Sequence, residues 1–504
     1  MGRLFCILLC SFLWIGAAPV KKRPRTVVAP PTLANRLQLT LNSNEASRSA
    51  HWGVYAVELA TGKTLLAHNA TRLFVPASNT KLFSTALAFD RLGPAYRFQT
   101  KIVSDMLPDK DGRIIGDLRL IGGGDPTMSG RSYPYQAVSK NPIKSTPNSP
   151  YGPLEELAAQ LIQKGVREIK GDIVGDDSRY PWDPFPDGWA VDDPLYEYGT
   201  PVSALIWNDN AFRLSLEAAN EIGAAPLLTL FPNVAYFNVQ NLVTTEEGRD
   251  SKINLRRVSL ANELVVTGQQ GNRAKVFTEL LGVDDPALFA ASALRESLEK
   301  LGVKISGNAR AMHRMSGESR QTGGQILAER ISPVLSEVAT VVNKVSQNLH
   351  AEILLREVAF LKRGEGTRQL GQLEMTDFLA QVGAAKNGFH FEDGSGLSRL
   401  TLLTPETAVK LLTYMHQSKN GEAYARTLPI GGEDGTLDTR FSGVASAARV
   451  HAKTGSLSHV SALSGYADSP KHGRIAFSIL VNNFNSPTAE IRTVIDKIVL
   501  ALAE

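Results

Sequence analysis

The chain reads Phe74-Val-Pro-Ala-Ser-Asn-Thr-Lys-Leu-Phe-Ser-Thr-Ala-Leu87, with Ser78 three residues before Lys81. The apolar residues that follow predict that this segment opens a buried helix. Residues three apart on a helix share one face. A serine at the helix start also lies near free backbone N–H groups and the positive end of the helix dipole. The segment therefore predicts a serine nucleophile with a lysine base beside it.

A second Ser-x-x-Lys shows that this spacing alone is not specific. Ser297 and Lys300 have the same spacing within 293–302, which we expect to be the exposed face of an ordinary amphipathic helix. The pair at Ser78 must therefore be judged by its partners elsewhere in the chain.

Two further motifs follow in chain order. Ser346-Gln-Asn348 lies in a helical pattern, and Lys453-Thr-Gly455, which occurs once, lies in a strand-like segment. Ser-x-Asn by itself is frequent in this chain. The ordered triple, in helix, helix and strand contexts, is much more specific than any of its parts.

The composition is that of a soluble globular protein of several domains. The chain has 504 residues, of which 43% are apolar and 21% charged. The net charge of +4 is too small to suggest nucleic acid as a dedicated partner. The nine histidines are scattered, and no phosphate or dinucleotide loop is completed. We therefore expect neither a metal site nor a cofactor.

The N-terminus reads as a secretory signal peptide over residues 1–18. Arg3 precedes an apolar stretch from Leu4 to Ile15, which is followed by small residues. That stretch is too short to span a membrane comfortably, so no stable transmembrane anchor is expected. Cys6 and Cys10, the two cysteines of the chain, both lie in it, so the mature protein is expected to lack thiol chemistry. Residues 19–36 are proline-rich and basic and are predicted to form a linker.

The remaining chain alternates between strand and helix patterns. Strands are expected at 51–59, 64–68, 449–457, 461–466 and 474–481, and helices at 78–92, 335–363, 404–417 and 490–502. This pattern predicts an α+β fold, an antiparallel sheet packed with helices. Residues 37–100 and 331–504 would form this catalytic domain. Residues 101–330 would be a large, mostly β insertion of one or two accessory domains.

At this point the chain resembles the D-alanyl-D-alanine carboxypeptidase/endopeptidase family of low-molecular-mass penicillin-binding proteins, of the penicillin-binding protein 4 type. The likeness runs from about residue 40 to the C-terminus. Besides the three motifs it rests on four segments: 198–205 with Asn208-Asp-Asn210, 343–352, 393–399 and 428–437. The resemblance implies a penicillin-binding/β-lactamase-type catalytic domain. Gln347 and Ser458-His459 depart from the family's usual residues. For His459 a partly exposed strand histidine is favoured over a residue that narrows the site or titrates beside it.

Chemistry assigns a role to each motif residue. Ser78 is the expected nucleophile and Lys81 its base, with the Lys81 pKa lowered by burial and by Lys453 nearby. Ser346 is expected to relay a proton to the leaving amine, and Asn348 to hold Lys81 or the substrate backbone. The third motif is expected to bind the substrate's terminal carboxylate and to supply, from Ser456 together with Ser78, the backbone N–H groups of an oxyanion hole. Its substrate-binding residues are Thr454, Gly455 and Ser456.

The resemblance implies an exported, periplasmic serine DD-peptidase that acts on peptidoglycan muropeptides and is acylated by β-lactams. The alternatives are a β-lactamase or esterase of the same fold, and a catalytically idle envelope-binding protein. The large insertion argues against the first alternative, because a minimal hydrolase needs no extra domains. The intact set of polar motif residues argues against the second.

Overall fold

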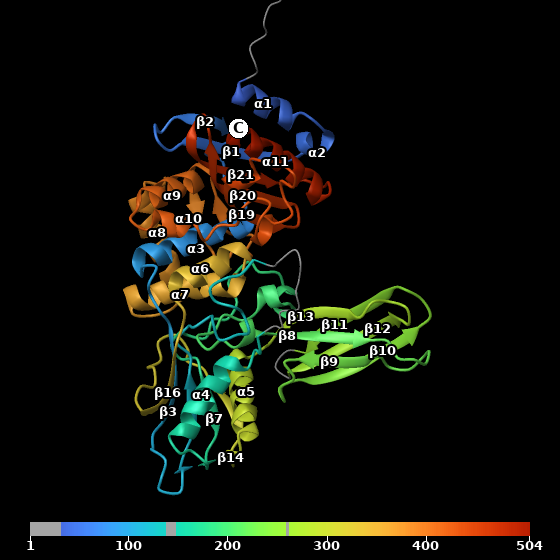
Figure 1. Cartoon of the computed structure of the whole chain (residues 1–504), viewed down its shortest axis with the longest axis vertical. Helices are drawn as coiled ribbons and strands as arrows, with labels where there is room; N and C mark the ends of the chain where they lie inside the picture. Colours follow the sequence, from blue (N-terminus) through green and yellow to red (C-terminus); the bar gives the residue numbers. More distant parts are fainter. Residues whose placement is uncertain (1–31, 138–147, 259–261) are drawn as a thin grey trace, which may run out of the picture.

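A computed structural model describes residues 32–137, 148–258 and 262–504 (Figure 1). Its centre is a five-stranded antiparallel sheet in the order β19-β20-β21-β1-β2. The first hairpin of the chain and the last three strands therefore share one sheet, with Val54 opposite Ile479. The strands are β1 His51–Glu58, β2 Thr64–His68, β19 Val450–Leu457, β20 Val460–Ser469 and β21 Gly473–Asn482.

Both faces of this sheet are covered by helices, because successive side chains of a strand point to opposite faces. On β1, Trp52 and Val54 join one core, while Tyr55 and Val57 face the other. The first core is covered by α1 Leu33–Leu41, α2 Glu45–Ser49 and α11 Thr488–Ala503. The second contains α3 Thr80–Arg91, α6 Leu335–Lys344, α7 Asn348–Arg363, α8 Arg368–Val382, α9 Pro405–Gln417 and α10 Gly421–Ala425. The predicted α+β class is confirmed.

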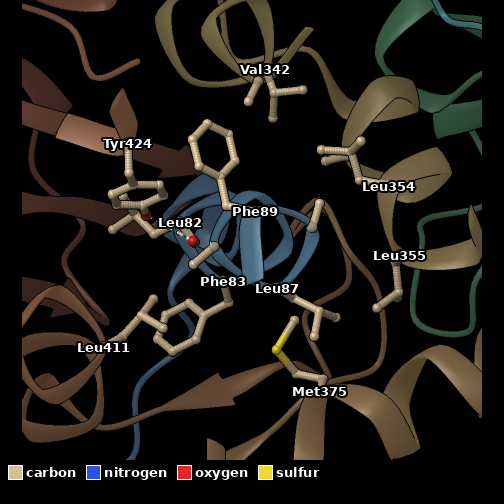
Figure 2. Close-up of a cluster of buried hydrophobic side chains, with 14 of the residues drawn as sticks. Leu82, Phe83, Leu87, Phe89, Val342, Leu354, Leu355, Met375, Leu411 and Tyr424 are labelled. Atoms are coloured by element: carbon tan, nitrogen blue, oxygen red, sulfur yellow. Dashed lines mark hydrogen bonds between the residues drawn. The ribbon is translucent and has the colours of Figure 1, made fainter. Parts of the chain in front are cut away.

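Helix α3 runs through the middle of the second core (Figure 2). Ten of its twelve residues are buried. Phe83, Leu87 and Phe89 point outward from the helix into side chains of the neighbouring helices, among them Met375 and Tyr424. The helix is thus packed around its whole circumference, as expected for a helix in the centre of a core. The helix that carries Lys81 is therefore fixed from every direction.

The helical pattern predicted over 335–363 is wrong as a single helix. The structure has two helices, α6 and α7, separated at residues 345–347. Ser346 adopts a left-handed φ of +66°, which a continuous helix does not allow. Gln347 then caps α7 with its side-chain oxygen, which accepts the backbone N–H of His350. The apolar periodicity continues across residues 345–347, so nothing in the sequence indicated the break between the two helices.

The inserted segment builds a second body around its own core (Figure 1). A mixed sheet in the order β15-β7-β5-β3-β16 packs against α4 Gly152–Gln163 and α5 Pro286–Lys300. Its first and last strands, β3 and β16, pair antiparallel, so the chain enters and leaves this body at neighbouring positions. The strands are β3 Gln99–Ser104, β5 Leu118–Ile121, β7 Ile173–Asp176, β15 Ala309–Met312 and β16 Gln325–Ile331.

Two three-stranded sheets form an arm that projects from this body, coloured green in Figure 1. Their strands are β8 Ala211–Glu217, β9 Leu227–Phe231, β10 Asn238–Glu246, β11 Ser251–Val258, β12 Glu263–Gly271 and β13 Phe277–Gly282. Shorter pairings involve β4 Arg113–Ile114, β6 Glu168–Ile169 and β14 Lys304–Ile305, and, between α8 and α9, β17 Phe389–His390 and β18 Leu402–Leu403.

The second Ser-x-x-Lys lies on α5, inside the insertion. Contrary to expectation, Ser297 is not on an exposed face: it is 2% exposed, and its hydroxyl donates to the Ala293 carbonyl one turn earlier. Ser297 is one of the buried residues of α5, a helix that packs against β7 and β15. Lys300 lies over the ring of Tyr151, 4.8 Å from its centroid. This pair is structural and is separate from the residues of the other motifs.

The predicted linker ends earlier than residue 36. Helix α1 begins at Leu33 because Thr32 caps it, and its buried Leu37 and Leu41 pack on the sheet. The predicted signal peptide, with both cysteines, and the rest of the linker lie outside the described residues. In the part of the chain that the structure describes, no helix is both long enough and apolar enough to cross a membrane.

Candidate active site

Ser78 lies in a single 3-10 turn, Ala77–Asn79, that leads directly into α3. Ala77 has a left-handed φ of +48°, an unusual conformation for a residue with a side chain. Two glycines press against this turn: a Cβ on Gly396 would lie 1.9 Å from the Ala77 carbonyl oxygen, and one on Gly455 would lie 2.7 Å from that of Pro76. Asn79 donates its side-chain amide to the Lys453 carbonyl at 2.9 Å. The nucleophile turn is thus held between strand β19 and the loop at 393–399.

Lys81 is fully buried, and its amine has three oxygen neighbours. Nζ lies 2.9 Å from Ser78 Oγ, 2.6 Å from Asn348 Oδ1 and 2.8 Å from the carbonyl oxygen of Ser395. Two of these neighbours come from segments more than 200 residues away in the sequence. The predicted pairing of Ser78 and Lys81 is therefore present in the structure, and Asn348 completes it.

Burial lowers the pKa of Lys81 to about 7, although the carboxylates of Asp393 and Glu352 act to raise it. The sequence led us to expect burial and the neighbouring Lys453 as causes of this low pKa, and burial is the largest of them. Burial, and then the charge of Lys81, also hold the pKa of Lys453 well below its usual range. Two amines in one buried site repel each other when both are protonated, so the free energy favours a state in which at least one is neutral.

The loop at 393–399 supplies a contact that the sequence did not predict. Its Ser395 carbonyl accepts from Lys81, and Asp393 fixes the loop by accepting the backbone N–H groups of Gly396 at 3.0 Å and Ser398 at 2.7 Å. Glu352, buried on α7, accepts the Ser395 N–H at 2.8 Å. Burial and the nearby Asp393 raise the pKa of Glu352 to about 7. Any residue type can supply a backbone carbonyl, so the identity of residue 395 did not predict this contact. Only the likeness of the segment 393–399 to a family motif indicated that it belongs to the site.

Lys453 and Ser346 form the other half of the site. Lys453 Nζ donates to Ser346 Oγ at 2.9 Å and to the Thr454 carbonyl at 2.9 Å. Ser346 can meet β19 because the chain turns sharply at this residue, between α6 and α7. The structure thus brings together Ser78, Lys81, Ser346, Asn348 and Lys453.

Strand β19 forms one edge of the site. The Thr454 hydroxyl donates to Thr436 Oγ1 at 2.8 Å, a neighbour from the segment 428–437. The Ser456 hydroxyl accepts from Arg492 of α11 at 3.0 Å. Gly455 between them lies against the nucleophile turn, where a side chain has no room.

Replacing Gly455 with alanine is expected to lower the rate of Ser78 acylation by about 100-fold, because the added methyl group would push β19 away from the Ser78 turn. The measurement is the rate of covalent labelling by a fluorescent penicillin. Gly152→Ala is the control for a new methyl group, since nothing lies near its Cβ position at the start of α4 and its backbone has no left-handed φ. Unchanged labelling of Gly455→Ala would show that the close packing has no catalytic importance.

A cavity of about 680 Å³ opens over these groups, and Ser78, Ser346, Asn348 and Ser456 all contribute to its lining. The opposite wall belongs to the insertion and includes Asp192, Asp193 and Tyr198. The insertion also reaches the chemistry directly, because the Tyr198 carbonyl accepts Asn348 Nδ2 at 2.7 Å. The inserted body is therefore part of the site.

His459 is not among the residues that line this cavity. It is exposed at the turn between β19 and β20, where its Nδ1 lies 2.8 Å from the Phe484 carbonyl oxygen. The turn directs His459 toward the segment after β21, which agrees with its interpretation as a partly exposed histidine. No group of three or more His, Cys, Asp or Glu side chains in the described ranges is arranged to hold a metal ion.

Comparisons with known proteins agree with the family resemblance inferred from the sequence. The D-Ala-D-Ala carboxypeptidase 3 (S13) family model matches residues 33–504. A D-alanyl-D-alanine carboxypeptidase of Actinomadura sp. (strain R39) is 32% identical over 464 residues, which cover 90% of this chain and 81% of that protein. D-alanyl-D-alanine carboxypeptidase DacB of Haemophilus influenzae is 25% identical over 469 residues, covering 92% and 91%.

Among solved structures, the chain is similar to penicillin binding protein 4 of Haemophilus influenzae. The TM-score is 0.78 at 25% identity, over 93% of this chain and 99% of that one. The resemblance to the penicillin-binding protein 4 type is confirmed. The chain therefore belongs to the D-Ala-D-Ala carboxypeptidase 3 (S13) family and is a serine-type D-Ala-D-Ala carboxypeptidase.

Proposed function

We propose that this enzyme works through an acyl-Ser78 intermediate with Lys81 as the base. The observation that carries the proposal is the set of three oxygens around Lys81 Nζ. Two of them, from Asn348 and Ser395, are carbonyl oxygens that can only accept, so they take the two hydrogens of a neutral amine. The lone pair is then left for the third neighbour, the hydroxyl of Ser78. The surroundings of the amine favour its basic form and aim it at the nucleophile.

In the proposed reaction Ser78 Oγ attacks the carbonyl carbon between the two D-alanines, and its proton passes to Lys81. The C–N bond then breaks, and the leaving nitrogen receives a proton through Ser346, which is hydrogen-bonded to Lys453. The net result is that the Ser78 hydroxyl proton replaces the acyl group on the leaving D-alanine. Water then adds to the ester carbonyl and releases Ser78 and the shortened peptide.

The third motif is proposed to bind the substrate. Thr454 and Lys453 suit a terminal carboxylate, because one offers a hydroxyl donor and the other regains a full charge beside an anion. The backbone N–H groups of Ser78 and Ser456 are the proposed oxyanion hole, and losing one such donor typically costs about 10²–10³ in rate. The packing of Gly455 on the Ser78 turn supports this, since it brings the two backbones together.

The acylation rate should depend on pH through Lys81. The base must be neutral, and its pKa is lowered to about 7, so the rate should be small at pH 5, rise through about 7 and level off above it. The measurement is the second-order rate of labelling by a penicillin between pH 5 and 9. A rate that is already at its maximum at pH 5 would contradict the role of Lys81 as the base.

We further propose that the enzyme hydrolyses D-amino-acid cross-links between peptidoglycan strands, and that β-lactams inhibit it. A β-lactam presents a carboxylate and a strained amide to the same groups. The open cavity, with one wall from the insertion, supports access by a branched peptide. The test is incubation with defined muropeptide monomers and cross-linked dimers, followed by mass spectrometry. Loss of D-alanine from monomers with dimers left intact would exclude the endopeptidase activity.

Export to the periplasm by the N-terminal segment is part of the same proposal, because the substrate lies outside the cytoplasm. We also assign residues 37–100 and 331–504 to the catalytic domain and 101–330 to an inserted accessory domain. The antiparallel pairing of β3 with β16 supports these boundaries. Determining the N-terminal sequence of the mature enzyme would test the predicted cleavage near residue 18.

A further inference from the structure

Asp209 of the insertion reaches across to the catalytic helix α7. Its Oδ1 lies 3.0 Å from Nε2 of His350, and its Oδ2 accepts Nε of Arg131 at 2.6 Å. His350 is fully buried and stands two residues after Asn348, in the first turn of α7. Asp209 therefore joins the inserted body to the turn that carries Asn348, whose side-chain oxygen accepts from Lys81.

The backbone at Asp209 is held in a conformation that L residues avoid. Asn208, Asp209 and Asn210 are three consecutive residues with left-handed φ values of 50°, 55° and 55°. Asn and Asp tolerate this conformation best, but three in a row are uncommon. Side-chain hydrogen bonds lock the turn, from Asn208 to the Ala211 carbonyl at 2.7 Å and from Asn210 to that of Pro201 at 3.0 Å. Such strain, held firmly by its surroundings, typically marks a functional position.

The carboxylate of Asp209 is the polar anchor of His350. Burial alone would raise the pKa of Asp209, but Arg131 and His350 more than offset this and hold it well below its usual range. An ionised carboxylate only accepts, so Nε2 is the nitrogen that carries the proton. Nδ1 of the same ring is buried and has no hydrogen-bond partner among the described residues. Among the described residues, Asp209 supplies the one side-chain hydrogen bond that the imidazole makes.

We propose that Asp209 is a positioning residue for the peptidase reaction: through His350 it fixes the first turn of α7 and so the amide of Asn348. This inference rests on the proposed roles of Lys81 and Asn348. Asn348 has to keep its oxygen toward Lys81 and its nitrogen toward the Tyr198 carbonyl, 2.7 Å away. Asp209 and Tyr198 both belong to the insertion, so the inserted body holds this turn at two points.

Loss of the Asp209 carboxylate should affect the acylation step more than the non-covalent binding of penicillin. The groups proposed to hold the substrate carboxylate lie on β19 and do not contact Asp209. A displaced Asn348 would instead leave the Lys81 lone pair poorly aimed at Ser78. A shift of about 1 Å at such a position can lower a rate by roughly 100-fold. For Asp209→Asn we expect the first-order acylation constant to fall by about 10–100-fold, with the dissociation constant of the non-covalent penicillin complex within about twofold of wild type.

The experiment measures both constants with a fluorescent penicillin for the full-length wild type, Asp209→Asn, Asn348→Ala and the double variant, with the melting temperature of each. If Asp209 acts by placing Asn348, its replacement should have no further effect in the Asn348→Ala background, so the two effects will not add. Asp284→Asn is the matched control. This carboxylate also pairs with an arginine of the insertion, Arg257 at 2.9 Å, and within the described ranges it makes no hydrogen bond or ion pair with α7.

Each outcome decides between the alternatives. Unchanged acylation in a folded Asp209→Asn protein, or effects that add with those of Asn348→Ala, would overturn the positioning role. A lower melting temperature with an unchanged acylation constant would reduce Asp209 to a stabilising residue. If Asp209→Asn does not fold, Arg131→Gln provides the test, because Arg131 is partly exposed and, in this network, contacts only the carboxylate of Asp209. The Arg131→Gln variant should be acylated severalfold more slowly than wild type. An unchanged acylation rate would overturn the positioning role of Asp209. Failure of wild type to react with penicillin would instead reject the proposed function.

Discussion

Ser78→Ala is expected to abolish covalent labelling by penicillin and to reduce release of D-alanine from a muropeptide by about 10⁴–10⁶-fold, the range seen when a catalytic-triad residue of a serine hydrolase is removed. The reason is that Ser78 Oγ is the oxygen 2.9 Å from the buried amine of Lys81. The measurements are mass spectrometry of the intact protein after penicillin treatment, and a D-alanine release assay. The melting temperature should stay close to that of wild type.

The chain contains its own control for this change. Ser297 has the same spacing to a lysine on α5, and its hydroxyl donates only to the Ala293 carbonyl. Ser297→Ala should therefore leave labelling intact and cost at most about 1 kcal/mol of stability. If Ser78→Ala were still labelled, the acyl-enzyme would have to form on another residue, and peptide mapping of the adduct would identify it.

Lys81→Met should have an effect nearly as large, a fall of roughly 10⁴-fold in the acylation rate. Methionine preserves much of the side-chain volume but offers no basic nitrogen. It also leaves the oxygens of Asn348 and Ser395 without their hydrogen-bond donor. The labelling rate should be measured from pH 5 to 9, because any residual reaction of the variant should lose the rise near pH 7.

Lys300→Met is the matched control for that variant, since Lys300 follows Ser297 at the same spacing and lies over the ring of Tyr151. It should be acylated at the rate of wild type and with the same pH dependence. A Lys81→Met protein that kept the rise near pH 7 would falsify the assignment of that pKa to Lys81. The base would then have to be sought among Glu352 and Lys453, whose pKa values are also shifted by burial.

The sequence predicted the α+β class and the segments that meet at the site, because side-chain periodicity and three short motifs are properties of residue types. It did not predict the break between α6 and α7. The apolar spacing runs through that break, and the left-handed φ of Ser346 depends on contacts with β19 rather than on serine itself. The motif residue was found, but the turn that directs it toward Lys453 was not.

The sequence predicted the contacts of Lys81 with Ser78 and Asn348, but it did not predict the backbone contacts around them. The Ser395 carbonyl accepts from Lys81 and the Tyr198 carbonyl accepts from Asn348, and any residue type can supply a carbonyl. The hydrogen bond between Asp209 and His350 joins positions 141 residues apart, with nothing in the local pattern to link them. Burial, the largest cause of the low Lys81 pKa, was expected from the sequence, but its extent depends on the whole core around α3, which no single segment contains.

The strand order of the central sheet has a consequence for how the enzyme becomes active. β1 pairs along its whole length with β21, so the hairpin that precedes Ser78 has no inner neighbour until the last strands have been synthesised. Contacts between such distant parts of a chain form slowly. The nucleophile is therefore among the first parts of the site to be made and among the last to be assembled. In the proposed reaction, penicillin labels Ser78 only when the site is assembled, so a pulse of labelled penicillin during refolding is expected to time the closure of this sheet.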